Sequence, residues 1–220
     1  MSLMPLFPAL AHRLWPVLCL LLLALPAQAA PERSPEQVIR DSIDELVGQI
    51  QGRRDYFADN MDELEALVDD SLEDVADFRY IGASVMGRYF RNATPQQRSR
   101  FVDTFRQTLI DTYAKGLVTF DYDELRVLDN QQPPRFEDQA SVAMEVVASD
   151  GTVYPVNYTL RLSDGEWKVV NVIVNGINLG LTFRNQFDQA MRDHGRDYDA
   201  VIDAWAPELA VEELEAGGDT

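Results

Sequence analysis

Hydrophobic positions along the chain follow two different periods. Between residues 35 and 115, apolar side chains recur every three or four positions, which is the spacing of one face of a helix. Between residues 118 and 175 they alternate with polar side chains, as in strands, and helical spacing returns after Gly180. This order of helices, then strands, then helices predicts an α+β fold.

Capping sequences mark the starts of two predicted helices. Ser34-Pro35-Glu36-Gln37 and Thr94-Pro95-Gln96-Gln97 both place a hydroxyl side chain before a proline and a glutamine three positions later. That pattern is typical of a capping box, with proline in the first helical turn. The spacing predicts helices over residues 34–50, 60–75, 81–90, 94–115 and 182–194, and a last helix from residue 196 or 198 to 206.

Four strands are predicted after Gly116, which is expected to end the preceding helix. They cover residues 118–128, 140–148, 153–162 and 166–175. Ser149-Asp150-Gly151 and Ser163-Asp164-Gly165 fit tight turns between consecutive strands. The last three strands should therefore form an antiparallel meander within a four-stranded sheet.

The last predicted strand is apolar on both faces. Regular alternation would point Val172 and Val174 to the side opposite Trp167 and Val169. Small antiparallel sheets usually keep one face in water, so the second apolar face needs a cover. Helices on both faces, or a dry cavity on one of them, would each fit, because a filled core and an empty one use the same side chains.

The first 29 residues have the features of a secretory signal peptide. His12 and Arg13 precede a run of nine apolar residues, and Ala27-Gln28-Ala29 fits the small residues of a cleavage site. Residues 30–209 are then expected to form one domain, and residues 210–220 an acidic, flexible tail. Cys19 lies in the apolar run, so the mature chain would contain no cysteine. No later stretch approaches the roughly 18 apolar residues of a membrane-spanning helix.

The chain is strongly acidic. Its formal charge is -18, and loss of Arg13 with the signal peptide would leave the mature chain one unit more negative. This charge argues against nucleic acid as a partner and against stable adsorption to an anionic membrane surface, because both require basic clusters. A soluble exported domain is the expectation that remains.

Motifs for catalysis or metal binding do not stand out in the sequence. His194 is the one histidine of the mature chain, and it lies in a polar stretch that fits a helix end. The acidic residues between Asp69 and Asp77 have helical spacing and lack the loop pattern of a calcium site. The chain contains no nucleophile elbow, phosphate loop or dinucleotide fingerprint. The sequence therefore predicts neither an enzyme nor a metal protein.

Two sequence blocks resemble a known family. The first contains Val85-Met86-Gly87-Arg88-Tyr89, then Ala93-Thr94-Pro95, Gln97-Arg98, Phe105, Leu109, Tyr113 and Leu117. The second contains Trp167, Asn171, Gly176-Ile177-Asn178-Leu179, Arg184 and Phe187. Together they resemble the signature of the periplasmic phospholipid-binding MlaC family, also called the toluene-tolerance Ttg2D family. Asn171, Asn175 and Asn178 depart from the family pattern, in which acids and a serine are expected.

The resemblance implies both a fold and a function. The fold would be a curved four-stranded antiparallel sheet wrapped by helices around an apolar cavity, NTF2-like in part. The function would be that of a monomeric periplasmic carrier that moves phospholipid between outer- and inner-membrane complexes and so maintains outer-membrane lipid asymmetry. The implied partners are phospholipid, an inner-membrane ABC transporter with its MCE-domain protein, and an outer-membrane lipoprotein–porin complex. Phospholipid would be cargo, and no cofactor is expected.

The same resemblance implies that one face of the sheet meets packed helices and the other meets lipid tails. The expected tail contacts come from the long helix, the strands and the segment after the last strand. They are Leu109, Tyr113, Leu117, Val142, Met144, Val146, Val156, Tyr158, Leu160, Val172, Val174, Ile177, Leu179 and Phe183. If the alternation of the last strand is reversed, Val169 and Ile173 would contact the lipid tails instead of Val172 and Val174.

Two other functions stay open from the sequence. An NTF2-like enzyme of the isomerase or dehydratase type would need an acid or a histidine among the inward strand positions. A non-enzymatic periplasmic adaptor would be packed solid and would dock a basic partner through its acidic surface. A strongly shifted pKa on a cavity floor would favour the enzyme, and an interior without room for an acyl chain would favour the adaptor.

Overall fold

The computed structural model describes residues 33–129 and 136–206. The predicted signal peptide and acidic tail lie outside these ranges. The helices of the described part are α1 (Pro35–Ile50), α2 (Arg54–Asp59), α3 (Met61–Val75), α4 (Phe78–Met86), the 3-10 helix η1 (Gly87–Asn92), α5 (Pro95–Tyr113), α6 (Gly116–Thr119), α7 (Leu179–Asp193) and α8 (Tyr198–Asp203). The strands are β1 (Tyr122–Val127), β2 (Gln139–Ala148), β3 (Val153–Ser163), β4 (Glu166–Val174) and β5 (Ile177–Asn178). The predicted α+β class is confirmed.

Both predicted capping boxes are present. The Gln37 amide donates to the Ser34 hydroxyl over 3.2 Å, and the Ser34 amide donates to the Gln37 side chain over 2.9 Å. Thr94 and Gln97 exchange the same two bonds, at 3.2 and 3.0 Å, at the start of α5. These bonds satisfy amides that have no partner inside a helix, so both helices begin where the sequence predicts.

Two short helices differ from the prediction. The α2 helix was not predicted, and its N-cap residue, Arg53, makes no capping bond through its side chain. The segment after Gly116, predicted as the start of a strand, forms the single turn of α6, closed by a 2.9 Å bond from the Phe120 amide to the Gly116 carbonyl. The first strand consequently begins at Tyr122.

The sheet is antiparallel, with strand order β1-β2-β3-β4-β5. Asp164 and Gly165 both have positive φ, 52° and 86°, as a tight hairpin turn between β3 and β4 requires. Asn175 and Gly176 repeat this geometry, with φ of 50° and 84°, and turn the chain back into the two-residue strand β5. The predicted strand number of four is therefore corrected to five.

A β-bulge corrects the predicted parity of β4. Leu160 pairs with Val169, and the next residue back along β3, Thr159, pairs with Asn171. Val170 is thus an extra residue, and it shifts the alternation by one position. As a result, Val172 and Val174 point to the same side as Trp167 and Val169, not to the opposite side, and Ile173 points away.

The two faces of the sheet differ in polarity. One face carries aligned apolar residues from four strands, for example Val142 beside Tyr158 and Val172. The other face carries Ser141 beside Thr159, and an ion pair between Arg126 and Glu145 at 3.0 Å. The second face is thus the polar one, and it does not present the apolar wall that was expected there for lipid tails. Contact of lipid tails with the apolar face stays a prediction.

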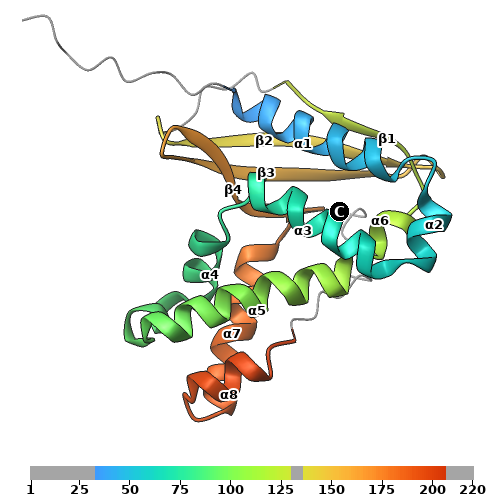
Figure 1. Ribbon diagram of the computed structural model, residues 1–220. Coiled ribbons are helices and arrows are strands. Elements are labelled where there is room, and N and C mark those ends of the chain that lie inside the picture. Colours follow the sequence, from blue (N-terminus) through green and yellow to red (C-terminus); the bar gives the residue numbers. More distant parts are fainter. Residues whose placement is uncertain (1–32, 130–135, 207–220) are drawn as a thin grey trace, which may run out of the picture. The chain divides into compact units, whose positions relative to one another are not determined.

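Helices α1 and α3 cover part of the apolar face. Val38 and Ile39 of α1 and Val75 of α3 form one buried cluster with sheet residues, which are Val142, Leu160, Trp167 and Val169. Figure 1 shows α1 running along the strands, α5 below α3, and α7 leading away from the sheet to α8. The sheet face is thus solidly packed near the hairpin that joins β3 to β4.

A second cluster, here called the aromatic cluster, joins the helices away from the sheet. Its rings are Tyr89, Phe101, Phe105, Phe183, Phe187 and Trp205. The Phe101 and Phe187 ring centroids lie 4.7 Å apart, and the Phe101 and Trp205 centroids lie 5.3 Å apart, both edge to face. This cluster fixes α5, α7 and α8 to one another through contacts distant in sequence.

Candidate functional site

Several apolar side chains on the apolar face of the sheet keep accessible surface. Five of them are called the half-buried patch below: Val146, Tyr154, Tyr158, Val172 and Val174. Two of these five, Tyr158 and Val172, also pack against the buried cluster under α1 and α3. Met144 and Val156, which are paired with each other, are buried on the same face between them. An apolar ligand that covers such half-buried side chains removes their remaining accessible surface from water, which favours binding.

Helix residues predicted as tail contacts are also half-buried. Leu109 of α5 packs against the aromatic cluster, and Leu117 of α6 packs against a third cluster built by α1, α2, α3 and α5. Tyr113, at the end of α5, is half-buried as well. Each of these side chains therefore has one part fixed by packing and another part still accessible.

The segment that joins β4 to α7 brings further predicted residues to this region. Ile177 in β5 and Leu179 at the start of α7 are half-buried, and Ile177 pairs with Val174 of the half-buried patch. Phe183, one turn further along α7, is buried in the aromatic cluster. The junction thus continues the apolar surface of the sheet onto α7.

The fourteen predicted contacts fall into two groups. Nine of them are half-buried: Leu109, Tyr113, Leu117, Val146, Tyr158, Val172, Val174, Ile177 and Leu179. The other five are buried: Val142, Met144, Val156, Leu160 and Phe183. Val142 and Leu160 lie under α1 and α3, and Phe183 lies inside the aromatic cluster, so these three already have protein neighbours. Contact with lipid tails stays a prediction for all fourteen residues. The nine half-buried side chains still have accessible surface that a tail can cover.

Tyr154 is a member of the half-buried patch that the predicted set omits. Its place on the face follows from its pairing with Val146, and its ring lies 5.9 Å from that of Phe120. The signal was present in the sequence, because Tyr154 alternates in step with Val156 and Tyr158. The pairing partner on β2 was the missing information.

The side chain of Tyr158 is largely removed from water. Its side chain keeps accessible surface, yet burial raises the pKa of the phenol from 10.0 to about 12. A phenol open to bulk water would not be desolvated to that extent. Tyr158 packs against the buried cluster under α1 and α3, which accounts for this desolvation.

We expect the Tyr158 phenol to titrate near pH 12. Because this pKa lies above the ordinary value of 10.0, the neutral phenol stabilises the fold relative to the phenolate. That contribution is complete below pH 10 and is lost as the pH rises through 12. Tyrosinate absorbance after rapid pH jumps should show a component near pH 12 in the native chain and none in Tyr158→Phe. If the substitution instead removes a phenol that titrates near pH 10, the desolvation of Tyr158 is refuted.

A separate cleft between α1 and α3 is polar. Its volume is about 490 Å³, and its lining includes Glu45, Asp70, Asp74 and Lys168. Lys168 is engaged there, since its ammonium group donates to the Asp74 carbonyl over 2.6 Å and lies 3.0 Å from the Glu166 carboxylate. Charged walls do not suit an acyl chain, so this cleft is not the candidate lipid site.

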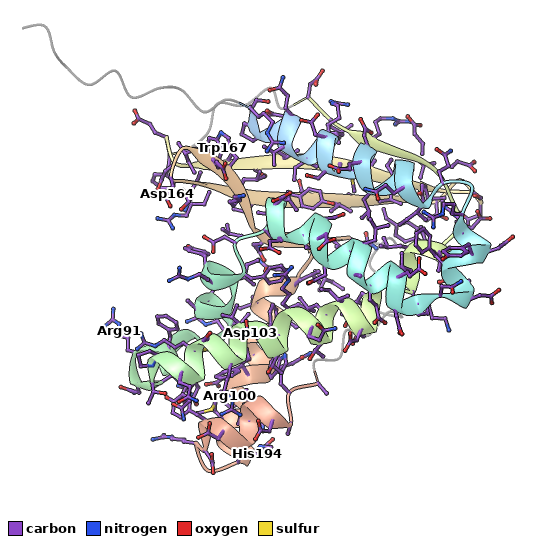
Figure 2. All side chains as sticks on the ribbon, in the orientation of Figure 1. Arg91, Arg100, Asp103, Asp164, Trp167 and His194 are labelled. Carbon is purple, nitrogen blue, oxygen red and sulfur yellow. The ribbon has the colours of Figure 1, made fainter. Side chains whose placement is uncertain are left out.

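Groups for metal or acid–base chemistry do not gather at the half-buried patch. Among the described residues, no cluster of three or more His, Cys, Asp or Glu side chains could hold a metal ion. His194 lies at the end of α7, where its Nδ1 is 3.0 Å from the Ala190 carbonyl. Figure 2 shows His194 near α8, far from Trp167 on the sheet. The arrangement at the patch supports binding of an apolar group.

The three asparagines that depart from the family pattern have structural roles here. The Asn171 side-chain oxygen accepts a 3.1 Å bond from the Gly180 amide, and the Asn178 side chain caps α7 by accepting a 3.0 Å bond from the Leu181 amide. A Cβ on residue 180 would lie 2.5 Å from that Asn171 oxygen, so glycine is needed there. Asn175 takes the left-handed conformation of the turn before β5. A neutral amide is thus sufficient to hold the junction in place.

Residues of the first sequence block hold helices together. Gly87 has φ of 52°, and a Cβ there would lie 2.7 Å from the Arg184 Nε. Arg88 forms an ion pair with Asp188 of α7, and the Tyr198 hydroxyl donates to the Tyr89 carbonyl over 3.0 Å. Gly87, Arg88 and Tyr89 of this block therefore join α4 and η1 to α7 and α8, and their role is packing.

None of the helices within residues 33–129 and 136–206 has the length and apolarity needed to cross a membrane.

Comparison with known proteins identifies relatives over most of the chain. The family model described as MlaC protein matches residues 40–207. Toluene tolerance protein ttg2D of Pseudomonas putida is 38% identical over 196 residues, which is 88% of this chain and 89% of that protein. The intermembrane phospholipid transport system binding protein MlaC of Haemophilus influenzae is 21% identical over 155 residues, or 69% of this chain and 72% of the relative.

A solved structure shares the fold. It is a phospholipid-binding protein from Ralstonia solanacearum in complex with a phospholipid, and it superposes with a TM-score of 0.70 at 22% sequence identity. The alignment covers 84% of this chain and 97% of that one. The predicted architecture of sheet and helices is therefore one that a solved protein adopts.

Proposed function

The chain belongs to the MlaC protein family, and from that membership we propose that it is a phospholipid carrier, not an enzyme. The bound lipid would place its acyl tails against the half-buried patch and the apolar side chains of α5, α6 and the junction before α7. The observation that carries this proposal is the half-buried patch itself, an apolar surface on the covered side of the sheet. The names of two relatives, which describe phospholipid binding or transport, point the same way.

The free energy of lipid transfer explains why such a carrier is needed. Burial of one methylene group contributes about 0.8 kcal/mol, so two tails of about 16 carbons each represent roughly 20–25 kcal/mol of transfer from water. Free diffusion of a phospholipid across an aqueous space is negligible against that cost. A protein whose cavity matches the bilayer in polarity makes the exchange between membrane and carrier nearly neutral, and no chemical step is required.

Membership of the family supports a proposal for the exchange partners and the location of the carrier. We propose that the chain works in the periplasm after removal of residues 1–29, as a monomer whose lipid-binding domain spans residues 30–209. It would exchange phospholipid with an outer-membrane lipoprotein–porin complex and with an inner-membrane ABC transporter that carries an MCE-domain protein. This traffic would maintain outer-membrane lipid asymmetry. The negative charge of the chain fits brief docking on proteins better than adsorption to anionic lipid.

An NTF2-like enzyme is the alternative that the strand positions argue against. The paired positions on the apolar face of β2, β3 and β4 carry aliphatic and aromatic side chains without an acid or a histidine. Tyr158 is the titratable group at the centre of this face, and a pKa of about 12 makes it a poor acid or base at neutral pH. Binding without catalysis is the function that these side chains support.

A vesicle assay tests the proposed function. Donor vesicles that contain a self-quenched fluorescent phospholipid are mixed with unlabelled acceptor vesicles, with and without the mature protein. We expect the protein to accelerate dequenching in proportion to its concentration, because it shields the acyl tails from water during transfer. Heat-unfolded protein at the same concentration is the control. A transfer rate equal to the spontaneous rate at all protein concentrations would contradict the carrier function.

A further inference from the structure

Tyr158 places a polar group in the middle of an otherwise apolar wall. Its neighbours across the sheet are Val142 on β2 and Val172 on β4, and its neighbours on the same side of β3 are Val156 and Leu160. A phenylalanine would pack as well in such surroundings, so packing alone does not account for the hydroxyl.

The hydroxyl of Tyr158 has no hydrogen-bond partner among the residues that the structure describes. The Tyr158 hydroxyl is not among the fully buried polar atoms that lack a partner, so a molecule that lies beside it can reach it. A hydroxyl kept from bulk water without a partner destabilises the fold, and a bond to such a molecule would remove that cost. The Tyr158 phenol is largely removed from bulk water, as its raised pKa indicates. A donor in this state is suited to an acceptor that arrives with a ligand.

The charge environment narrows the class of acceptor. Burial alone raises the Tyr158 pKa, with no contribution from a charged neighbour. A lipid phosphate would be an unpaired anion in these surroundings, which is strongly unfavourable. A neutral acceptor that accompanies the acyl chain into the apolar region has no such cost, and the acyl ester carbonyl is the neutral acceptor that a diacyl phospholipid carries.

We propose that Tyr158 is a specificity-determining residue, whose hydroxyl donates a hydrogen bond to an acyl ester carbonyl of the bound phospholipid. The inference rests on the proposed function and adds a preference to it. An ether-linked phospholipid with the same head group and the same chain length lacks the carbonyl, so it would leave the hydroxyl without its acceptor. The chain should therefore bind ester-linked phospholipid more tightly than its ether-linked counterpart.

Competition between the two lipids tests this directly. Purified protein is equilibrated with mixed vesicles of diacyl and dialkyl phosphatidylethanolamine of equal chain length, and the bound lipids are extracted and quantified by mass spectrometry. One hydrogen bond predicts a preference for the diacyl lipid of roughly 3- to 10-fold. Tyr158→Phe should bind both lipids with no preference. Tyr80→Phe, which removes a hydroxyl from an exposed ring of α4 outside the half-buried patch, should keep the preference of the native chain.

Each outcome of the competition decides a separate point. Equal binding of the two lipids by the native chain, or an unchanged preference in Tyr158→Phe, overturns the assignment of Tyr158 and leaves the carrier function standing. Loss of the preference in Tyr80→Phe as well as in Tyr158→Phe would show that the loss does not depend on the position of the hydroxyl, and it would also overturn the assignment of Tyr158. Binding of neither lipid by the native chain overturns this inference and the carrier function together.

Discussion

Replacement of Val146 by glutamate is expected to abolish phospholipid binding while the protein stays folded. Val146 lies on the apolar face in the half-buried patch, so a carboxylate there would project into the surface that the tails cover. A carboxylate in hydrocarbon costs about 2.5–3.5 kcal/mol on the membrane-insertion scale, which corresponds to a loss of affinity of roughly 100-fold. Without lipid the same side chain can be hydrated, because Val146 keeps accessible surface.

A matched variant on the other face separates charge from position. Val153 lies beside Tyr154 on β3, it pairs with Val147 on the polar face, and it is 48% exposed. Val153→Glu should therefore bind lipid like the native chain. Lipid extracted from the two gently purified variants is quantified by mass spectrometry, with circular dichroism as the test of folding. Undiminished lipid in folded Val146→Glu would show that the half-buried patch does not contact the tails.

Replacement of Phe187 by alanine is expected to destabilise the fold by about 3–5 kcal/mol. The Phe187 ring is 0% exposed, and its centroid lies 4.7 Å from that of Phe101 and 5.6 Å from that of Trp205. Removing it leaves a cavity at the contact between α5 and α7, where close packing prevents the neighbouring rings from collapsing fully.

Leu181 provides the control on the same helix. Its side chain is 54% exposed, so Leu181→Ala should change the free energy of unfolding by no more than about 0.5 kcal/mol. Urea unfolding followed by tryptophan fluorescence measures both variants, since Trp205 belongs to the aromatic cluster. Similar midpoints for the Phe187→Ala and native chains would mean that the aromatic cluster does not hold the helices together.

Features that depend on neighbours in sequence could be predicted well. The Ser34 and Thr94 capping boxes, the turn at Asp164 and Gly165, and the helical spacing of α5 each follow from a few consecutive residues. The α2 helix was not predicted, because Arg53 supplies no capping bond through its side chain and so does not mark the start of a helix. A helix of six residues also offers too few positions for a periodic pattern.

Features that depend on pairing between strands could not be predicted from the chain alone. The extra residue Val170 reverses the alternation of β4, and nothing in the sequence from Trp167 to Val174 marks a bulge. Burial at the predicted site could not be predicted either, because it depends on helices that are distant in the sequence. Val142 and Val146 are identical residues in one strand, and only the position of α1 and α3 makes the first a core residue and leaves the second half-buried.

The proposed carrier function requires an apolar space beside the half-buried patch that takes up acyl chains. Native mass spectrometry of the mature protein, isolated from the periplasmic fraction without detergent, measures this most directly. We predict a species heavier than the polypeptide by the mass of diacyl phospholipid, and release of intact phospholipid when that species is dissociated. A single species at the mass of the polypeptide, unchanged after incubation with phospholipid vesicles, would contradict the account.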